Sequence, residues 1–120
     1  MKILIVDDIV INRFIVRELI KKEGHIPVEA ENGKIALDLF QNDSFDLIFM
    51  DIEMPVMNGI ETVHYIRTKF PAPKNKVKIF ALTAYNPAIL HEELNVSEFD
   101  GIITKPYSAD KIKKVLNAIE

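Results

Sequence analysis

The sequence of 120 residues contains no cysteine. Disulfides, thiolate metal sites and cysteine nucleophiles are therefore excluded, which is compatible with a reducing compartment. No apolar run approaches the roughly 20 residues that a membrane-spanning helix needs. The first run, from Ile3 to Val6, reaches Asp7 after four residues, so it is not a signal peptide. We expect a cytoplasmic protein without a membrane partner.

Basic charge is not in excess either, because 15 lysines and arginines stand against 18 acidic residues and the net charge is −3. No basic patch is visible, so direct nucleic-acid binding is not expected. The histidines His25, His64 and His91 lack the spacing of metal ligands, and we interpret them as surface or structural residues. The length and the 48% hydrophobic composition fit one globular domain over residues 1–120.

Short apolar runs alternate with segments of helical periodicity along the whole chain. We predict strands at Lys2–Val6, Ile26–Ala30, Asp46–Met50, Val77–Leu82 and Gly101–Thr104. We predict helices at Ile11–Lys22, Gly33–Gln41, Gly59–Phe70, Pro87–Leu94 and Ser108–Ile119. Strands alternating with helices indicate an α/β fold with a parallel sheet and right-handed crossovers. Pro27 near the start of the second strand favours an edge position.

Polar side chains follow four of these strands at the point where each strand ends. Asp7 and Asp8 follow the first strand, Asp51 the third, Thr83 the fourth, and Lys105 comes directly after the fifth. Because open α/β sheets bind ligands at the carboxyl ends of their strands, we expect these side chains to form one polar site.

Three clustered carboxylates need a counter-charge, since like charges a few Å apart raise each other's pKa or recruit a cation. Oxygen ligands without histidine or cysteine favour Mg²⁺, with Mn²⁺ as an alternative. Asp7 and Asp8 would hold this metal, and Lys105 and Thr83 would contact the oxygens of a phosphoryl group. Asp51 could then act as the nucleophile and form an acyl phosphate.

At this point the sequence resembles a response-regulator receiver domain of two-component signalling, most like the receivers of hybrid sensor kinases or phosphorelays. The matching motifs are Val6-Asp7-Asp8 with Asn12-Arg13, Gly24-His25, Glu31-Asn32-Gly33, the run from Met50 to Gly59, Ala81-Leu82-Thr83-Ala84 and Lys105-Pro106. The resemblance implies a flavodoxin-like doubly wound sheet of five parallel strands in the order 2-1-3-4-5, with five helices.

By the same resemblance, Asp51 accepts a phosphoryl group from a phosphohistidine on a sensor histidine kinase or a histidine phosphotransfer protein. Asp8, Asp51 and the backbone carbonyl of Glu53 would bind Mg²⁺, with Asp7 helping through water. The domain would be no separate enzyme, but would catalyse its own phosphorylation and slow dephosphorylation. It would be a monomer or a weak dimer, and Lys105-Pro106 would be a cis peptide.

Four positions bear on how far the chain follows the family pattern. Ile9 follows the acid pair, Ile102 stands where many members carry a Tyr or Phe that moves with the Thr, and Glu53 and Tyr85 stand two residues beyond Asp51 and Thr83. We therefore expect a weaker aromatic switch, and the lifetime of the acyl phosphate is left open. Both a single-domain relay protein and a receiver that is part of a longer protein fit the sequence.

Helix one carries more apolar residues than one buried stripe needs, so we predict that it forms part of the partner surface. The residues concerned are Val10, Ile11, Phe14, Ile15, Val16, Leu19 and Ile20. The alternative is scattered surface apolar residues, which are common.

Other readings of the polar residues stay open. Asp7-Asp8 could be a helix N-cap and turn, Thr83 a strand-end hydroxyl and Lys105 a solvated charge. A haloacid-dehalogenase-like phosphatase would need a second Asp as general acid where this chain has Glu53. A flavin binder would place its phosphate against Asp7-Asp8, which would repel it. A degenerate receiver that only docks partners would lack some of the chemical residues, which are all present here.

Overall fold

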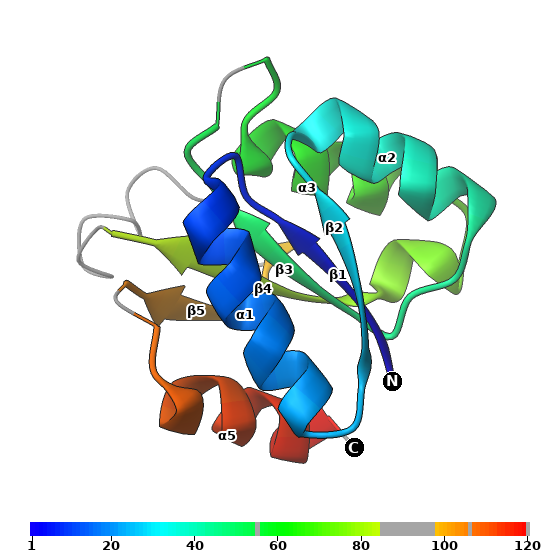
Figure 1. Ribbon diagram of the computed structural model, residues 1–120. Helices are drawn as coiled ribbons and strands as arrows, with labels where there is room; N and C mark the ends of the chain where they lie inside the picture. Colours follow the sequence, from blue (N-terminus) through cyan, green and yellow to red (C-terminus); the bar gives the residue numbers. More distant parts are fainter. Residues whose placement is uncertain (55, 85–97, 106, 120) are drawn as a thin grey trace.

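The computed structural model describes residues 1–54, 56–84, 98–105 and 107–119, and Figure 1 shows their arrangement. One parallel sheet of five strands has the order β2-β1-β3-β4-β5. The strands are β1 (Lys2–Val6), β2 (Ile26–Ala30), β3 (Leu47–Asp51), β4 (Lys78–Thr83) and β5 (Gly101–Thr104). The helices are α1 (Val10–Lys22), α2 (Gly33–Asn42), α3 (Gly59–Lys69), the short 3₁₀ turn η1 (Lys74–Lys76) and α5 (Ala109–Ile119). The predicted fold class and strand order are confirmed.

The central strands are buried on both faces, so successive residues of β1 enter different layers of the core. Leu4 and Val6 lie in a cluster with residues of α2 and α3, whereas Ile3 and Ile5 lie in a cluster with residues of α1 and α5. Figure 1 shows the same arrangement, with α1 and α5 on one face and α2 and α3 on the other. Continuous apolar runs are what a parallel sheet covered on both faces requires.

Local capping fixes where the helices begin and end. Asn58 accepts from the backbone N–H of Glu61, whose side chain accepts from the N–H of Asn58, so α3 begins with a reciprocal capping box. At the end of α1, Gly24 has a φ of 84°, and the N–H groups of Gly24 and His25 donate to carbonyls of the last turn. This left-handed position explains the glycine after Lys22.

The observed boundaries differ from the predicted ones by at most one residue. For example, β3 begins at Leu47 because Asp46 is engaged with β1: its carboxylate accepts from the N–H of Lys2, and its own N–H donates to the Lys2 carbonyl. The sequence did not predict η1. β2 is an edge strand, as Pro27 indicated. The predicted helix Pro87–Leu94 and the predicted cis peptide at Lys105-Pro106 lie outside the described residues.

None of the helices in the described ranges is long and apolar enough to cross a membrane.

Candidate acidic site at the strand ends

The register of the sheet brings the predicted polar residues to one edge. Val6 of β1 pairs with Met50 of β3, so Asp7 and Asp51 come next on two neighbouring strands. Thr83 pairs with Thr104 at the ends of β4 and β5, and Lys105 follows. The sequence predicted from the strand ends alone that these side chains lie close together. The parallel pairing of the strands explains why they do.

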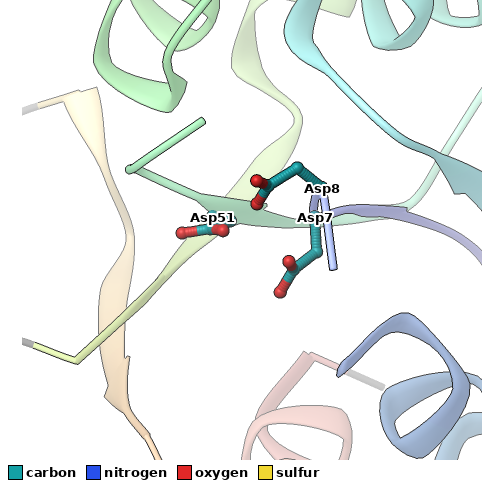
Figure 2. Close-up of side chains that lie close together, drawn as sticks. All are labelled: Asp7, Asp8 and Asp51. Carbon is teal, nitrogen blue, oxygen red and sulfur yellow. The ribbon is translucent and has the colours of Figure 1, made fainter. Parts of the chain in front are cut away.

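Three carboxylates form the centre of the site. One oxygen from each of Asp7, Asp8 and Asp51 lies within 4.8 Å of the others, and in Figure 2 the carboxylates of Asp8 and Asp51 face each other with that of Asp7 beside them. Asp7 and Asp51 are almost completely buried, at 1% and 2% exposed, whereas Asp8 is exposed. Two of the three acids are therefore buried, and only Asp8 is open to solvent.

Asp7 is held at both its backbone and its side chain. Its Oδ1 accepts from the backbone N–H of Ile9 at 2.9 Å, and its own N–H donates to the carbonyl of Ala30 at 3.2 Å. The N-cap position of α1 is occupied by Ile9, which has no capping side chain. Asp7 and Asp8 therefore do not cap α1, and the Asp7 side chain instead holds the turn that leads into the helix.

Asp51 ends β3, and its Oδ1 accepts from the backbone N–H of Glu53 at 3.1 Å. Burial raises the pKa of the Asp51 carboxyl to about 7, and the negative charge of Asp7 adds to this rise. The Glu53 hydrogen bond and the Lys105 charge lower the pKa but do not outweigh burial. The side chain of Glu53 is exposed, so its link to Asp51 is through the backbone.

Lys105 supplies the positive charge of the site. Its Nζ lies 3.7 Å from Asp51 Oδ2 and 3.8 Å from Asp7 Oδ2. Its backbone N–H donates to the Thr83 carbonyl at 2.7 Å, which fixes the end of β5 to the end of β4. Thr83 itself is completely buried. One ammonium group against three carboxylates leaves an excess of negative charge where the strands end.

The donor chemistry fits a hard divalent cation. Among the described residues, Asp7, Asp8 and Asp51 are the group of three or more possible ligands that come close enough to share one ion. All three offer carboxylate oxygens, which Mg²⁺ prefers. Burial and the negative charge of Asp7 raise the pKa of Asp51, and a cation bound between the carboxylates would favour the ionised form of Asp51.

Two residues at this edge were not assigned a role from the sequence. Arg13 of α1 donates from Nη1 to the backbone carbonyl of Asp7 at 2.7 Å, and the Tyr107 hydroxyl lies 3.5 Å from Asp7 Oδ2. Arg13 belongs to the Asn12-Arg13 motif that resembles the family, so the sequence carried a signal for it. The sequence carried no signal for Tyr107, because its contact with Asp7 depends on the fold placing the segment after β5 next to the end of β1.

The loop between β3 and α3 folds tightly against Asp51. A Cβ on Gly59 would lie 2.2 Å from the Asp51 carbonyl oxygen, so only glycine fits at the start of α3. Val56 in the same loop has a φ of 73° and is 80% exposed. A β-branched residue is strained in this left-handed conformation.

An apolar surface lies beside the acids at the start of α1. Its members are Ile9, Val10, Ile11, Phe14 and Ile15, which are between 40% and 69% exposed. Of the apolar residues predicted on this helix, Val16 and Ile20 are buried in the core. A cavity of about 370 Å³, lined by Asn12, Ile15, Lys105 and Tyr107, joins the apolar surface to the acidic site.

Ile102, which departs from the Tyr or Phe that many receiver domains carry at its position, is half-buried and packs against the core cluster formed with α2 and α3. Tyr85, the other departure near Thr83, and His91 lie outside the described residues. His25 contacts the N-terminal amine, and His64 contacts Glu98. These two histidines therefore have structural partners, as predicted.

The family model for the response regulator receiver domain matches residues 3–117. The chain is 32% identical to the chemotaxis protein CheY of Bacillus subtilis, over 97% of this chain and 94% of that protein. It is 39% identical to a protein-glutamate methylesterase/protein-glutamine glutaminase of Desulfotalea psychrophila over 86% of this chain. It spans 29% of that protein's length, and 12–15% of the lengths of several histidine kinases that it also matches.

The fold is similar to that of the response regulator TrrA of Thermotoga maritima, solved in complex with Mg²⁺ and beryllofluoride. The TM-score is 0.87 at 34% sequence identity, and the similarity covers 99% of this chain and 98% of that one.

Proposed function

The chain belongs to the response regulator receiver domain family, and on this premise we propose that Asp51 is the residue that accepts the phosphoryl group. The chain is a phosphoacceptor signalling domain of two-component systems. The observation that carries the assignment is the position of Asp51, which ends the central strand β3 beside Asp7, Asp8 and Lys105. We propose that residues 1–120 form one receiver domain.

In the proposed reaction, a carboxylate oxygen of Asp51 forms a bond to phosphorus. The bond between phosphorus and the imidazole nitrogen of the donor breaks, and its electron pair stays on the imidazole, which takes up a proton. The product is an acyl phosphate on Asp51. Lys105 lies within 4 Å of Asp51 and would bind an oxygen of the phosphoryl group, and the Thr83 hydroxyl would donate to another.

Asp7, Asp8, Asp51 and the backbone carbonyl of Glu53 would hold Mg²⁺, or Mn²⁺ in its place. When bound, the cation neutralises negative charge on the carboxylates and on the phosphoryl oxygens. Asp8 is the exposed member of the cluster and therefore meets an arriving cation first. We propose that the same residues catalyse phosphorylation and the slow hydrolysis of the acyl phosphate.

Incubation with a small acyl-phosphate donor and Mg²⁺ tests the assignment by intact mass. The wild type should gain one phosphate, and both Asp51→Asn and a sample with EDTA should gain none. Equal labelling of the wild type and Asp51→Asn would place the reaction elsewhere. Asp38→Asn, an exposed acid on α2, is the matched control and should label like the wild type.

Receiver domains of hybrid kinases and CheY-like proteins interact with histidine kinases or phosphotransfer proteins. We propose that the apolar surface of α1 receives a helix of such a partner, which would bring its phosphohistidine to Asp51. The support is the exposure of Val10, Ile11 and Phe14 next to the acids, since exposed apolar groups gathered on one helix can mark a surface that binds another protein.

Ile15→Asp tests the docking surface, because Ile15 is 40% exposed and lines the cavity beside Lys105. This variant should slow transfer from a phosphodonor protein and leave labelling by the small donor unchanged. Thr68→Asp, on an exposed position of α3, is the control. A parallel fall in both rates for Ile15→Asp would mean that the site, not the docking surface, was damaged.

A further inference from the structure

We propose that Arg13 is a positioning residue for the metal-binding peptide Asp7-Asp8, acting through its hydrogen bond to the Asp7 carbonyl. This inference rests on the proposed function of the acidic site, because it concerns how that site holds its cation. Arg13 stands five residues after Asp8 in the motif that opens the chain, and the phosphoryl chemistry above gives it no role.

The side chain of Arg13 connects three elements. From α1 it donates to the backbone carbonyl of Asp7 through Nη1 at 2.7 Å and to Glu29 Oε1 of β2 through Nε at 3.3 Å. The side chain is 13% exposed, so these bonds are mostly shielded from water. Since Nε and Nη1 belong to one rigid plane, fixing Nε on β2 fixes the direction from which Nη1 meets Asp7.

The carbonyl that Arg13 binds belongs to the peptide joining Asp7 to Asp8. The N–H on the other side of Asp7 is bound to the Ala30 carbonyl of β2. Both peptide groups that flank Asp7 are therefore tied to the neighbouring strand, one directly and one through Arg13 and Glu29. Asp7 and Asp8 carry two of the three carboxylates in the cluster, and they lie on either side of the peptide that Arg13 holds.

Loss of Arg13 has two opposing effects on a bound cation, and their magnitudes decide which one dominates. Removal of a positive charge would strengthen cation binding. Glu29 faces both Arg13 at 3.3 Å and Arg17 at 3.1 Å, so it offsets only part of this charge. The remaining effect of one partly exposed charge on cation binding is small. Loss of an orienting hydrogen bond behind metal ligands lowers affinity by about 10–100-fold. Positioning should therefore dominate.

Arg17 provides a matched comparison on the same helix. Its Nη1 donates to Glu29 Oε2 at 3.1 Å, so it shares the carboxylate partner of Arg13, while its other contacts are with Glu18 and the Phe14 ring rather than with Asp7. Replacement of Arg17 removes the same charge from the same carboxylate and leaves the Asp7 bond in place. A difference between the two variants thus isolates the contact to the Asp7 carbonyl.

Calorimetric titration of the full chain with MgCl₂, well below its unfolding temperature, tests the proposal without phosphorylation. Arg13→Met keeps the apolar stem and should bind Mg²⁺ about tenfold or more weakly, whereas Arg17→Met should stay within about twofold of the wild type. Arg13→Lys keeps the charge but loses the planar fork, so it should also remain weaker than the wild type. Wild-type affinity in either Arg13 variant would overturn the proposal.

Two further measurements keep the result interpretable. Circular dichroism and thermal unfolding identify a variant that does not fold; if Arg13→Met is lost in this way, Arg13→Lys decides alone. Asp8→Ala should abolish Mg²⁺ binding. If the wild type binds no Mg²⁺, or Asp8→Ala binds like the wild type, the proposed metal site fails. If only the Arg13 variants bind like the wild type, the positioning role fails and the site stands.

Discussion

The hydroxyl of Tyr107 lies 3.5 Å from the Oδ2 atom of Asp7. A residue beyond the end of β5 thus reaches the carboxylate that follows β1, although 100 positions separate the two in sequence. Lys105 Nζ lies 5.8 Å from the centre of the Tyr107 ring, so the tyrosine lies next to both the Asp7 carboxylate and the Lys105 ammonium group. Burial raises the pKa of Tyr107 well above its usual range, and the charges of Asp7 and Asp51 add to this rise.

Tyr107 should therefore stay protonated when ordinary tyrosines ionise near pH 10. In an alkaline titration followed by absorbance at about 295 nm, wild type and Tyr107→Phe should coincide up to about pH 11. A smaller absorbance rise in Tyr107→Phe than in the wild type below about pH 11 would show that Tyr107 ionises normally and is not buried against the acids.

The contribution of Asp51 to the free energy of unfolding should fall with rising pH in the absence of divalent cations. The pKa of Asp51 is about 7 in the folded protein against 3.8 when unperturbed, so the folded state holds the extra proton between these pH values. The contribution of Asp51 to the free energy of unfolding is therefore fully present below about pH 4, falls through this window and is constant above about pH 7. Asp51→Asn should lack this slope and exceed the wild type by on the order of 4 kcal/mol at pH 8.

Urea unfolding in EDTA at pH 5 and at pH 8 measures this effect. Asp38→Asn, an exposed acid on α2, should keep the wild-type slope. Addition of Mg²⁺ should reduce the advantage of Asp51→Asn at pH 8, since the cation stabilises the ionised site. Equal pH slopes in the wild type and Asp51→Asn would contradict the raised pKa of Asp51.

Arg67 of α3 should be important for stability. Its guanidinium donates to the carbonyls of Asn75, Val77 and Glu98 at 2.9, 2.6 and 2.9 Å, and to the Asp100 carboxylate at 3.2 Å. Arg67→Met removes the hydrogen bonds to the three carbonyls and to Asp100, and should cost about 2–4 kcal/mol in urea unfolding. The exposed Lys69→Met should stay within about 0.5 kcal/mol of the wild type. Similar values for the two variants would refute this role.

Val56 should be a site where a substitution stabilises the protein. Its φ of 73° is unfavourable for a β-branched side chain, and its exposure of 80% means that little packing is lost on replacement. Val56→Gly relieves the strain but adds freedom to the unfolded chain, so the net gain should be about 1 kcal/mol. Val56→Ala should gain less. A destabilised Val56→Gly would mean that this side chain makes contacts important to the loop.

The sequence predicted every strand of the sheet because short apolar runs mark the strands. It predicted the helix ends because capping residues act locally. It also predicted that Asp7, Asp8 and Asp51 meet, since parallel strands place their carboxyl ends at one edge. It did not predict the hydrogen bonds of Arg13 or Arg67, which depend on how a long side chain crosses to another element. The raised pKa of Asp51 likewise follows from burial in three dimensions, and no local pattern encodes it.

Chemical location of the phosphoryl group tests the central claim most directly. Borohydride reduces an aspartyl phosphate to homoserine with release of phosphate, and the product is stable enough for peptide mass sequencing. After phosphorylation by a small acyl-phosphate donor and reduction, homoserine should appear at position 51, only when Mg²⁺ was present. Homoserine at position 7 or 8 instead, or its absence from a phosphorylated sample, would contradict the assignment of Asp51 as the phosphoacceptor.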